Sequence, residues 1–192
     1  MSFFRKPIMN KTPEAVVSLF WVYQYVRSYE AMPETRALRA IGDKDEQRRY
    51  KGQNFDYITP GGTFGYCNDV SLVEPSSLIC IDLDHLDDDS PEMKLKVSPA
   101  DMKQLLLADP YWGEETLLLF TSPRGHGVKW FVPIDLGRCD YKTWYVALRT
   151  YLLRTYGLGE KQVDSSVANL SHACFLSYDP DAYLRTNLIE HF

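Results

Sequence analysis

Two aspartates, Asp82 and Asp84, follow directly on the apolar run Leu78–Ile81, which predicts a buried strand. Alternation along a strand puts both carboxylates on one face, with α-carbons about 6.6 Å apart. At an effective dielectric near 20, two such charges repel by about 2.5 kcal/mol. A divalent cation, a shared proton or solvent at the strand end would offset that repulsion. Mg²⁺ or Mn²⁺ suits an Asp-x-Asp pair, and a solvated turn is the alternative.

A second group of polar residues lies between two further apolar segments, 116–121 and 128–134, which predict a hairpin. Glycines in its tip let backbone N–H groups approach an anion, and the hydroxyl and basic side chains add donors and charge. The residues that we expect to bind a nucleotide here are Ser122, Arg124, Gly125, His126, Gly127 and Lys129. A glycine-rich turn without any ligand is the alternative.

Asp164 is the third candidate carboxylate, and it follows Gln162-Val163 in a short predicted strand. A lone aspartate before serines is also common as a helix cap. Three carboxylates beside an anion-binding hairpin are the residue types that two-metal phosphoryl or nucleotidyl transfer uses. We therefore expect Asp82, Asp84 and Asp164 to be both catalytic and metal-binding residues. For His172, late in the chain, two placements are open. It faces the cleft between these carboxylates and the hairpin, or it belongs to the core or the surface.

The elements that must position these residues alternate irregularly between helix and strand, which predicts an α+β fold with a mixed or antiparallel sheet and flanking helices. Capping residues and apolar periodicity predict helices over 12–29, 33–41, 43–51, 98–108 and 140–157. Strands are expected over 2–8, 55–59, 78–84, 116–121, 128–134, 162–164 and 173–178. The basic residues of the helix over 43–51 form a solvated face or contact phosphate.

Composition places the chain among ordinary globular proteins. Its 192 residues, 45% of them hydrophobic, fit one domain over 1–192, or one domain of two lobes. No apolar run approaches 18 residues and the N-terminus lacks a signal-peptide pattern, so we expect a cytoplasmic protein without a membrane partner. Four cysteines without C-x-x-C spacing favour reduced thiols over a zinc site or disulfides.

The net charge of −5 arises in the middle third of the chain. Residues 61–120 hold 3 Lys and Arg against 12 Asp and Glu, whereas the flanking thirds hold 10 against 7 and 8 against 7. Such an acidic centre suits a metal site that serves a phosphate-rich substrate, because bound cations reverse the local sign. A solvated acidic loop is the alternative.

The order of these motifs, an Asp-x-Asp strand end, a Ser/Gly-rich turn with a basic residue on the next strand and a late aspartate, resembles the archaeo-eukaryotic primase (primase-polymerase) superfamily. Almost the whole chain resembles the VirE N-terminal-like domains of mobile-element proteins. The segments that carry this resemblance are 3–8, 59–64, 77–86, 122–129 and 173–180. In primases the second motif carries a histidine that contacts the nucleotide phosphates, and the matching position here is Lys129.

The resemblance implies a primase-polymerase-like catalytic core and a nucleotidyltransferase that uses Mg²⁺ or Mn²⁺ in replication of a mobile element. Its partners would be nucleoside triphosphates, a DNA template or primer, and a helicase encoded alongside. A noncatalytic primase-like module that binds nucleic acid or docks to the helicase is the second hypothesis, favoured by Lys129 in place of histidine. A metal-dependent nuclease using the same acids is the third.

Overall fold

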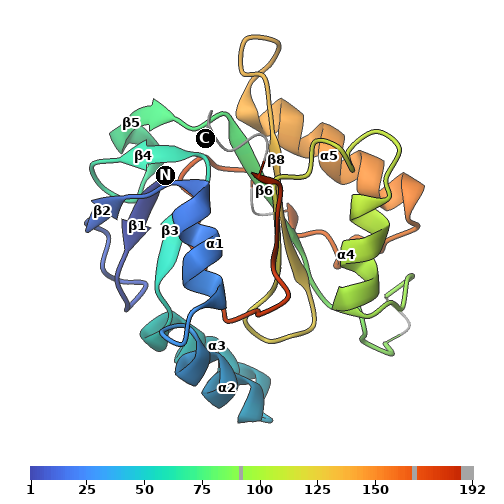
Figure 1. Cartoon of the computed structure of the whole chain (residues 1–192), viewed down its shortest axis with the longest axis horizontal. Coiled ribbons are helices and arrows are strands. Elements are labelled where there is room, and N and C mark those ends of the chain that lie inside the picture. Colours follow the sequence, from blue (N-terminus) through green and yellow to red (C-terminus); the bar gives the residue numbers. More distant parts are fainter. Residues whose placement is uncertain (91–92, 166–167, 187–192) are drawn as a thin grey trace.

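The computed structural model describes residues 1–90, 93–165 and 168–186, and it is built around two four-stranded antiparallel sheets. The first sheet has the strand order β2-β1-β3-β9, and the second has the order β10-β7-β8-β6. Helices α4 and α5 lie on one side of the second sheet, and α1 with the first sheet lies on the other (Figure 1). The predicted α+β class is therefore confirmed.

The strands of the first sheet are short. They are β1 (Ser2–Phe4), β2 (Ala15–Val16), β3 (Tyr57–Thr59) and β9 (Cys174–Phe175). A small separate hairpin joins β4 (Gly62–Phe64) to β5 (Leu72–Pro75), with a single 3₁₀ turn, η1 (Asp69–Ser71), between them. This hairpin was not among the predicted strands, because Gly61, Gly62 and the turn formers before Ser77 obscure the strand pattern.

The second sheet carries the candidate site. Its strands are β6 (Leu78–Leu83), β7 (Leu118–Thr121), β8 (Val128–Pro133) and β10 (Tyr183–Leu184). The predicted hairpin is confirmed, because β7 pairs antiparallel with β8, and β6 pairs with β8 along its whole length. The other edge of β6 meets residues 162–164, where Leu83 and Val163 form an isolated antiparallel bridge. β10 was not predicted.

The helices begin directly after their capping residues. They are α1 (Leu19–Arg27), α2 (Met32–Ala40), α3 (Lys44–Asn54), α4 (Pro99–Leu107) and α5 (Tyr141–Thr155). The side chains of Asp43, Ser98 and Asp140 accept hydrogen bonds from backbone N–H groups in the first turns of α3, α4 and α5. In the part of the chain that the structure describes, no helix is long and apolar enough to cross a membrane.

The predicted start of the first helix at Thr12 and Pro13 is wrong. Ser18 is the residue that caps α1, and its side chain accepts a hydrogen bond from the N–H of Trp21. Residues 15 and 16 form β2 because they pair with β1. A tertiary strand pairing has here overridden a local helix signal.

Side chains on the two faces of β6 enter two different cores. Ile79, Ile81 and Leu83 are fully buried against α4 and α5. Cys80 packs on the opposite face against the first sheet, where its Sγ lies 3.9 Å from that of Cys174. Asp82 belongs to that face by alternation, so the fold places a carboxylate at the edge of the contact between the two sheets.

Candidate active site

Asp82 lies opposite Lys129 in the register of β6 and β8, and the two side chains form a buried ion pair. Only 9% of Asp82 and 6% of Lys129 is exposed. Burial lowers the pKa of the Lys129 ammonium, but the facing carboxylate of Asp82 more than compensates, so the pKa lies above its ordinary value. The facing carboxylate therefore stabilises the charged form of Lys129 in spite of its burial.

Asp164 lies beside Asp82 on the other edge of β6. The backbone N–H of Asp164 donates to the carbonyl of Asp82 at 3.3 Å, and the N–H of Asp84 donates to the carbonyl of Gln162 at 3.0 Å. Together with the bridge between Leu83 and Val163, these bonds make Asp164 the cross-strand neighbour of Asp82. Directly opposite residues share a face, with Cβ atoms about 4.5–5.5 Å apart. The structure thus brings the early and late aspartates together.

Asp84 follows the last residue of β6, and its side chain is half-buried. Its Oδ2 lies 3.8 Å from a guanidinium nitrogen of Arg124 in the hairpin tip. A carboxylate at the strand end thus faces a basic residue of the predicted nucleotide-binding turn. Both side chains keep partial access to solvent, as a site for a soluble ligand requires.

The tip of the β7–β8 hairpin is a tight turn that packs against the end of β6. The N–H of Ser122 donates to the carbonyl of Gly127 at 2.8 Å, and the N–H of Gly125 donates to the carbonyl of Ser122 at 2.9 Å. Gly125 has φ +88°, a conformation that L side chains rarely adopt. A Cβ at Gly127 would collide with the carbonyl oxygen of Leu83. Both glycines are therefore required by the geometry of this turn.

Arg39 of α2 binds the backbone of the hairpin tip. Its guanidinium donates to the carbonyls of Pro123 and Ser122, at 3.2 and 3.3 Å. Arg39 was not among the residues predicted from the sequence, because its partners are backbone atoms more than 80 positions away. Together with the hydrogen bond from the N–H of Leu86 to the carbonyl of His126, it fixes the position of the loop.

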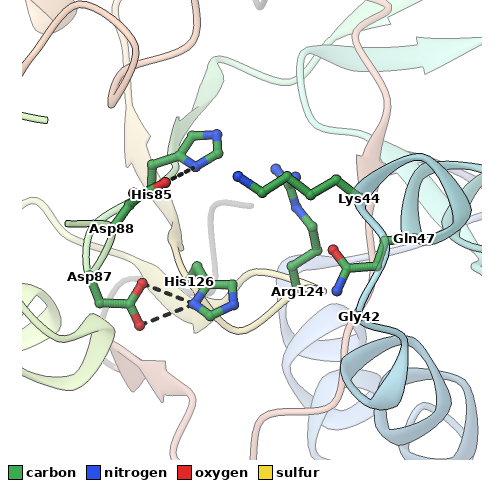
Figure 2. Close-up of a pocket in the computed structure, with 8 residues that line it drawn as sticks. All are labelled: Gly42, Lys44, Gln47, His85, Asp87, Asp88, Arg124 and His126. Atoms are coloured by element: carbon green, nitrogen blue, oxygen red, sulfur yellow. Dashed lines mark hydrogen bonds and ion pairs between the residues drawn. The ribbon is translucent and has the colours of Figure 1, made fainter. Parts of the chain in front are cut away.

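His126 pairs with Asp87, which lies beyond the end of β6. Its Nδ1 lies 2.9 Å from Oδ1 and 3.1 Å from Oδ2 of Asp87, and the imidazole is largely exposed. With Arg124 and Asp87 it lines a cavity of about 250 Å³ beside the site (Figure 2). The structure therefore separates His126 from Ser122 and Lys129, with which the sequence had grouped it.

Two side chains that the predicted set omitted also belong to the site. Lys51 of α3 is half-buried, and its pKa is lowered by burial and then by the positive charges of Lys129 and Arg124. Burial, followed by the charge of Lys129, lowers the pKa of His172 to about 4. His172 is thus a neutral imidazole at pH 7 that faces the site. The basic pattern of α3 was the signal for Lys51.

Two buried side-chain atoms lack a hydrogen-bond partner within the described residues, Oδ1 of Asp82 and Oγ of Ser122. Buried polar atoms are nearly always paired, because an unpaired one costs about 1–3 kcal/mol. Both atoms belong to the candidate site. An ion, a water molecule or a substrate group at this place would satisfy them.

The donor set is compatible with a hard divalent cation, because the three aspartates supply carboxylate oxygens. Among residues 1–90, 93–165 and 168–186, no group of three or more His, Cys, Asp or Glu side chains is arranged to hold a metal ion. Mg²⁺ at nucleotide sites is usually held by only one or two carboxylates together with substrate phosphates. The side chains therefore fit a cation that arrives with a nucleotide better than a permanently bound one.

A family model described as "BT4734-like, N-terminal domain" matches residues 50–184 of the chain. The predicted membership of the VirE N-terminal-like or primase-polymerase families is wrong, because the matching model describes a different family. The shared order of short motifs was insufficient to identify the family. No curated protein and no solved structure matches the chain.

Proposed function

The chain belongs to the BT4734-like N-terminal domain family, and we propose that it is a metal-dependent nucleotidyltransferase that acts on nucleoside triphosphates and DNA. The observation that carries the proposal is the pair of unsatisfied buried oxygens, on Asp82 and Ser122. They lie beside the segment that bears Asp164 and beside a basic hairpin tip. An ion, a water molecule or a substrate group would satisfy such atoms, and the proposal assigns them to the substrate and its cation.

Asp82, Asp84 and Asp164 would hold the cation in this proposal. A bound Mg²⁺ or Mn²⁺ would supply Lewis-acid stabilisation of the charge that develops on phosphate oxygens. The hydroxyl of Ser122 would donate to a phosphate oxygen, and the guanidinium of Arg124 could donate two parallel hydrogen bonds to the same phosphate. Gly125 and Gly127 would contribute by forming the tight turn that positions both side chains.

The ion pair of Lys129 with Asp82 is compatible with this role. Each partner compensates a buried charge that would be costly alone. When a nucleotide and its cation bind, Lys129 would exchange the carboxylate for a phosphate, and Asp82 would exchange the ammonium for the cation. Charge in the site would then stay balanced in both states.

The proposal does not depend on the primase-polymerase-like core predicted from the sequence. It depends only on how the side chains of the site are arranged. The support consists of three acidic residues on two paired segments and a basic hairpin tip next to them. Family membership adds nothing to it, and a helicase partner stays a further proposal without support from these contacts.

A noncatalytic domain that binds nucleic acid is the second candidate. The observation that favours it is the same Lys129–Asp82 pair, because the ammonium already neutralises the buried carboxylate of the site. In this case polynucleotide binding would depend steeply on salt and would require no metal.

Thermal unfolding with Mn²⁺ and a nonhydrolysable nucleoside triphosphate tests ligand binding. A ligand at 100 times its Kd stabilises a protein by about 2.7 kcal/mol, or about 5–11 °C in Tm for a chain of this size. Asp84→Asn with Asp164→Asn should abolish the shift while leaving the Lys129–Asp82 pair intact. Glu74→Gln with Glu114→Gln removes the same charge from exposed positions and should leave the shift unchanged.

Extension of a labelled DNA primer tests catalysis and separates the candidates. Products lengthen for a nucleotidyltransferase, stay unchanged for a binding domain and shorten for a nuclease. Extension that is lost in the Asp84/Asp164 variant but kept in the Glu74/Glu114 variant is the expected result. The absence of both extension and a nucleotide-dependent Tm shift in the native chain would overturn the proposal.

A further inference from the structure

A groove runs outward from the candidate site between α3 and the hairpin tip. Two adjoining cavities, of about 250 and 290 Å³, share Lys44, Gln47 and Arg124 in their walls. The second cavity is also lined by Arg48 and Lys51. Figure 2 shows Lys44, Gln47 and Arg124 on one side of the first cavity, with His85, Asp87 and Asp88 across from them.

The cations of this groove come from one face of α3. Lys44, Arg48 and Lys51 are spaced at intervals of four and three residues, so they lie in a row that rises about 10 Å along the helix. None of the three forms an ion pair with a carboxylate of the described residues. Arg124 continues the row from the hairpin tip.

Two of the acidic groups in the groove, Asp87 and Asp88, lie across the first cavity from Lys44 (Figure 2). Asp87 contacts the imidazole of His126 at 2.9 Å, and Asp88 lies 3.5 Å from that of His85. Asp45 is the one acidic residue in the wall of the second cavity. The second cavity is thus lined by four Lys and Arg side chains against one Asp, a local excess of positive charge in a chain whose net charge is −5.

Holding these cations together costs free energy. The half-buried Lys51 has a lowered pKa, caused first by burial and then by the neighbouring charges of Lys129 and Arg124. An extended anion in the groove would relieve this repulsion along the whole row, whereas a single ion would relieve it only locally.

We propose that the groove along α3 binds the phosphodiester backbone of a single-stranded polynucleotide and leads that strand to the candidate site. The inference rests on the proposed function, because it assigns the path of the strand on which that reaction would act. The cations face a concave cleft of the protein, whereas duplex DNA is read by an element that protrudes into its major groove. The imidazoles of His85 and His126 on the opposite wall offer flat faces on which bases can stack.

The salt dependence of binding provides a quantitative test. The logarithm of the association constant for a single strand falls with the logarithm of salt concentration by about 0.7 per phosphate contact. Four contacts, from Lys44, Arg48, Lys51 and Arg124, predict that affinity falls about 50-fold between about 50 and about 200 mM KCl. Two contacts predict a fall of only about 7-fold.

Fluorescence anisotropy of a labelled oligo-dT strand, measured with the full chain, gives this slope. Lys44→Gln with Arg48→Gln should reduce the salt effect from about 50-fold to about 7-fold. Arg36→Gln with Arg49→Gln removes two exposed charges from positions that line neither cavity, and it should leave the slope unchanged. Unlabelled single strand should compete well, and a duplex of the same length should compete poorly.

Three results would overturn the inference: no binding of the strand by the native chain, equal slopes for the two double variants, or equal competition by duplex. The Tm shift with Mn²⁺ and nucleotide, measured on the same variants, separates this inference from the proposed function. The Lys44/Arg48 variant should keep that shift. If the Lys44/Arg48 variant instead loses the nucleotide-dependent Tm shift and keeps the salt dependence of strand binding, the groove binds the triphosphate and not the strand. A native chain that binds the strand but shows no nucleotide shift would overturn the proposed function alone.

Discussion

Lys129→Met removes the cation that compensates Asp82 and leaves a carboxylate buried without its partner. Only 9% of Asp82 is exposed, and its Oδ1 has no hydrogen-bond partner within the described residues even in the native chain. Removing one partner of a buried pair costs about 3–5 kcal/mol. For a chain of this size, each kcal/mol lowers Tm by about 2–4 °C, so we expect a loss of about 6–20 °C.

The loss should depend on pH with a definite sign. Burial raises the pKa of Asp82, and Lys129 is the largest influence that opposes it. Without Lys129 the folded-state pKa rises further. A carboxyl whose pKa is higher in the folded state contributes stability below its unfolded pKa of about 3.9 and loses it as pH rises through the folded value. The deficit of the variant relative to the native chain should therefore be largest at pH 8 and smaller at pH 5.

Urea denaturation of both proteins at pH 5 and pH 8 measures this deficit. Asp82→Asn together with Lys129→Met removes both charges, and it should recover a large part of the loss at pH 8. Lys142→Met changes an exposed lysine of α5 and should alter stability by less than about 0.5 kcal/mol. An equal deficit at both pH values, with no recovery in the double variant, would refute the assignment of Lys129 as the partner of a charged Asp82.

Two more predictions concern the same site. Gly127→Ala places a Cβ against the carbonyl oxygen of Leu83, and neither backbone can move freely, so we expect a loss of about 1–3 kcal/mol or more in urea denaturation. Gly65→Ala, where a Cβ meets nothing within 4 Å, is the control, and equal losses would contradict the packing argument. The imidazole of His172 should titrate near pH 4 by NMR, because burial and Lys129 disfavour its protonated form. Its contribution to stability is present above the unfolded pKa of about 6.5 and is lost as pH falls towards 4, so His172→Gln should flatten the stability profile in that range. A titration near 6.5 would show that the ring is solvated.

Much of the helical structure could be predicted because its signals are local. Asp43, Ser98 and Asp140 cap α3, α4 and α5 within one residue of the predicted starts. A cap and its N–H partner lie three residues apart, so a short stretch of sequence contains the whole interaction. Thr12 carried a similar signal and was misleading, because β2 pairs with β1 in the segment that would have continued that helix.

The candidate site was predictable in its residue types and only partly in its contacts. Asp82, Asp84 and Asp164 were chosen because carboxylates at strand ends suit a cation, and the pairing of 162–164 with β6 brings Asp164 to Asp82. His126 carried the same kind of signal as Lys129 but points to Asp87 instead. Its direction depends on the conformation of the hairpin tip, which the sequence does not specify.

The sequence by itself determined where α3, α4 and α5 begin, that β6, β7 and β8 are strands, and which of these elements carry acids and bases. Propensity, capping and alternation act over a few neighbouring residues, so a short stretch of sequence contains these signals. Only the tertiary structure decided that Lys129 compensates Asp82, that Asp164 lies on the far edge of the same strand, and that α3 turns its cations toward the hairpin tip. These contacts join residues that are tens of positions apart. They follow from strand register and from the packing of two sheets, which depend on the whole chain at once.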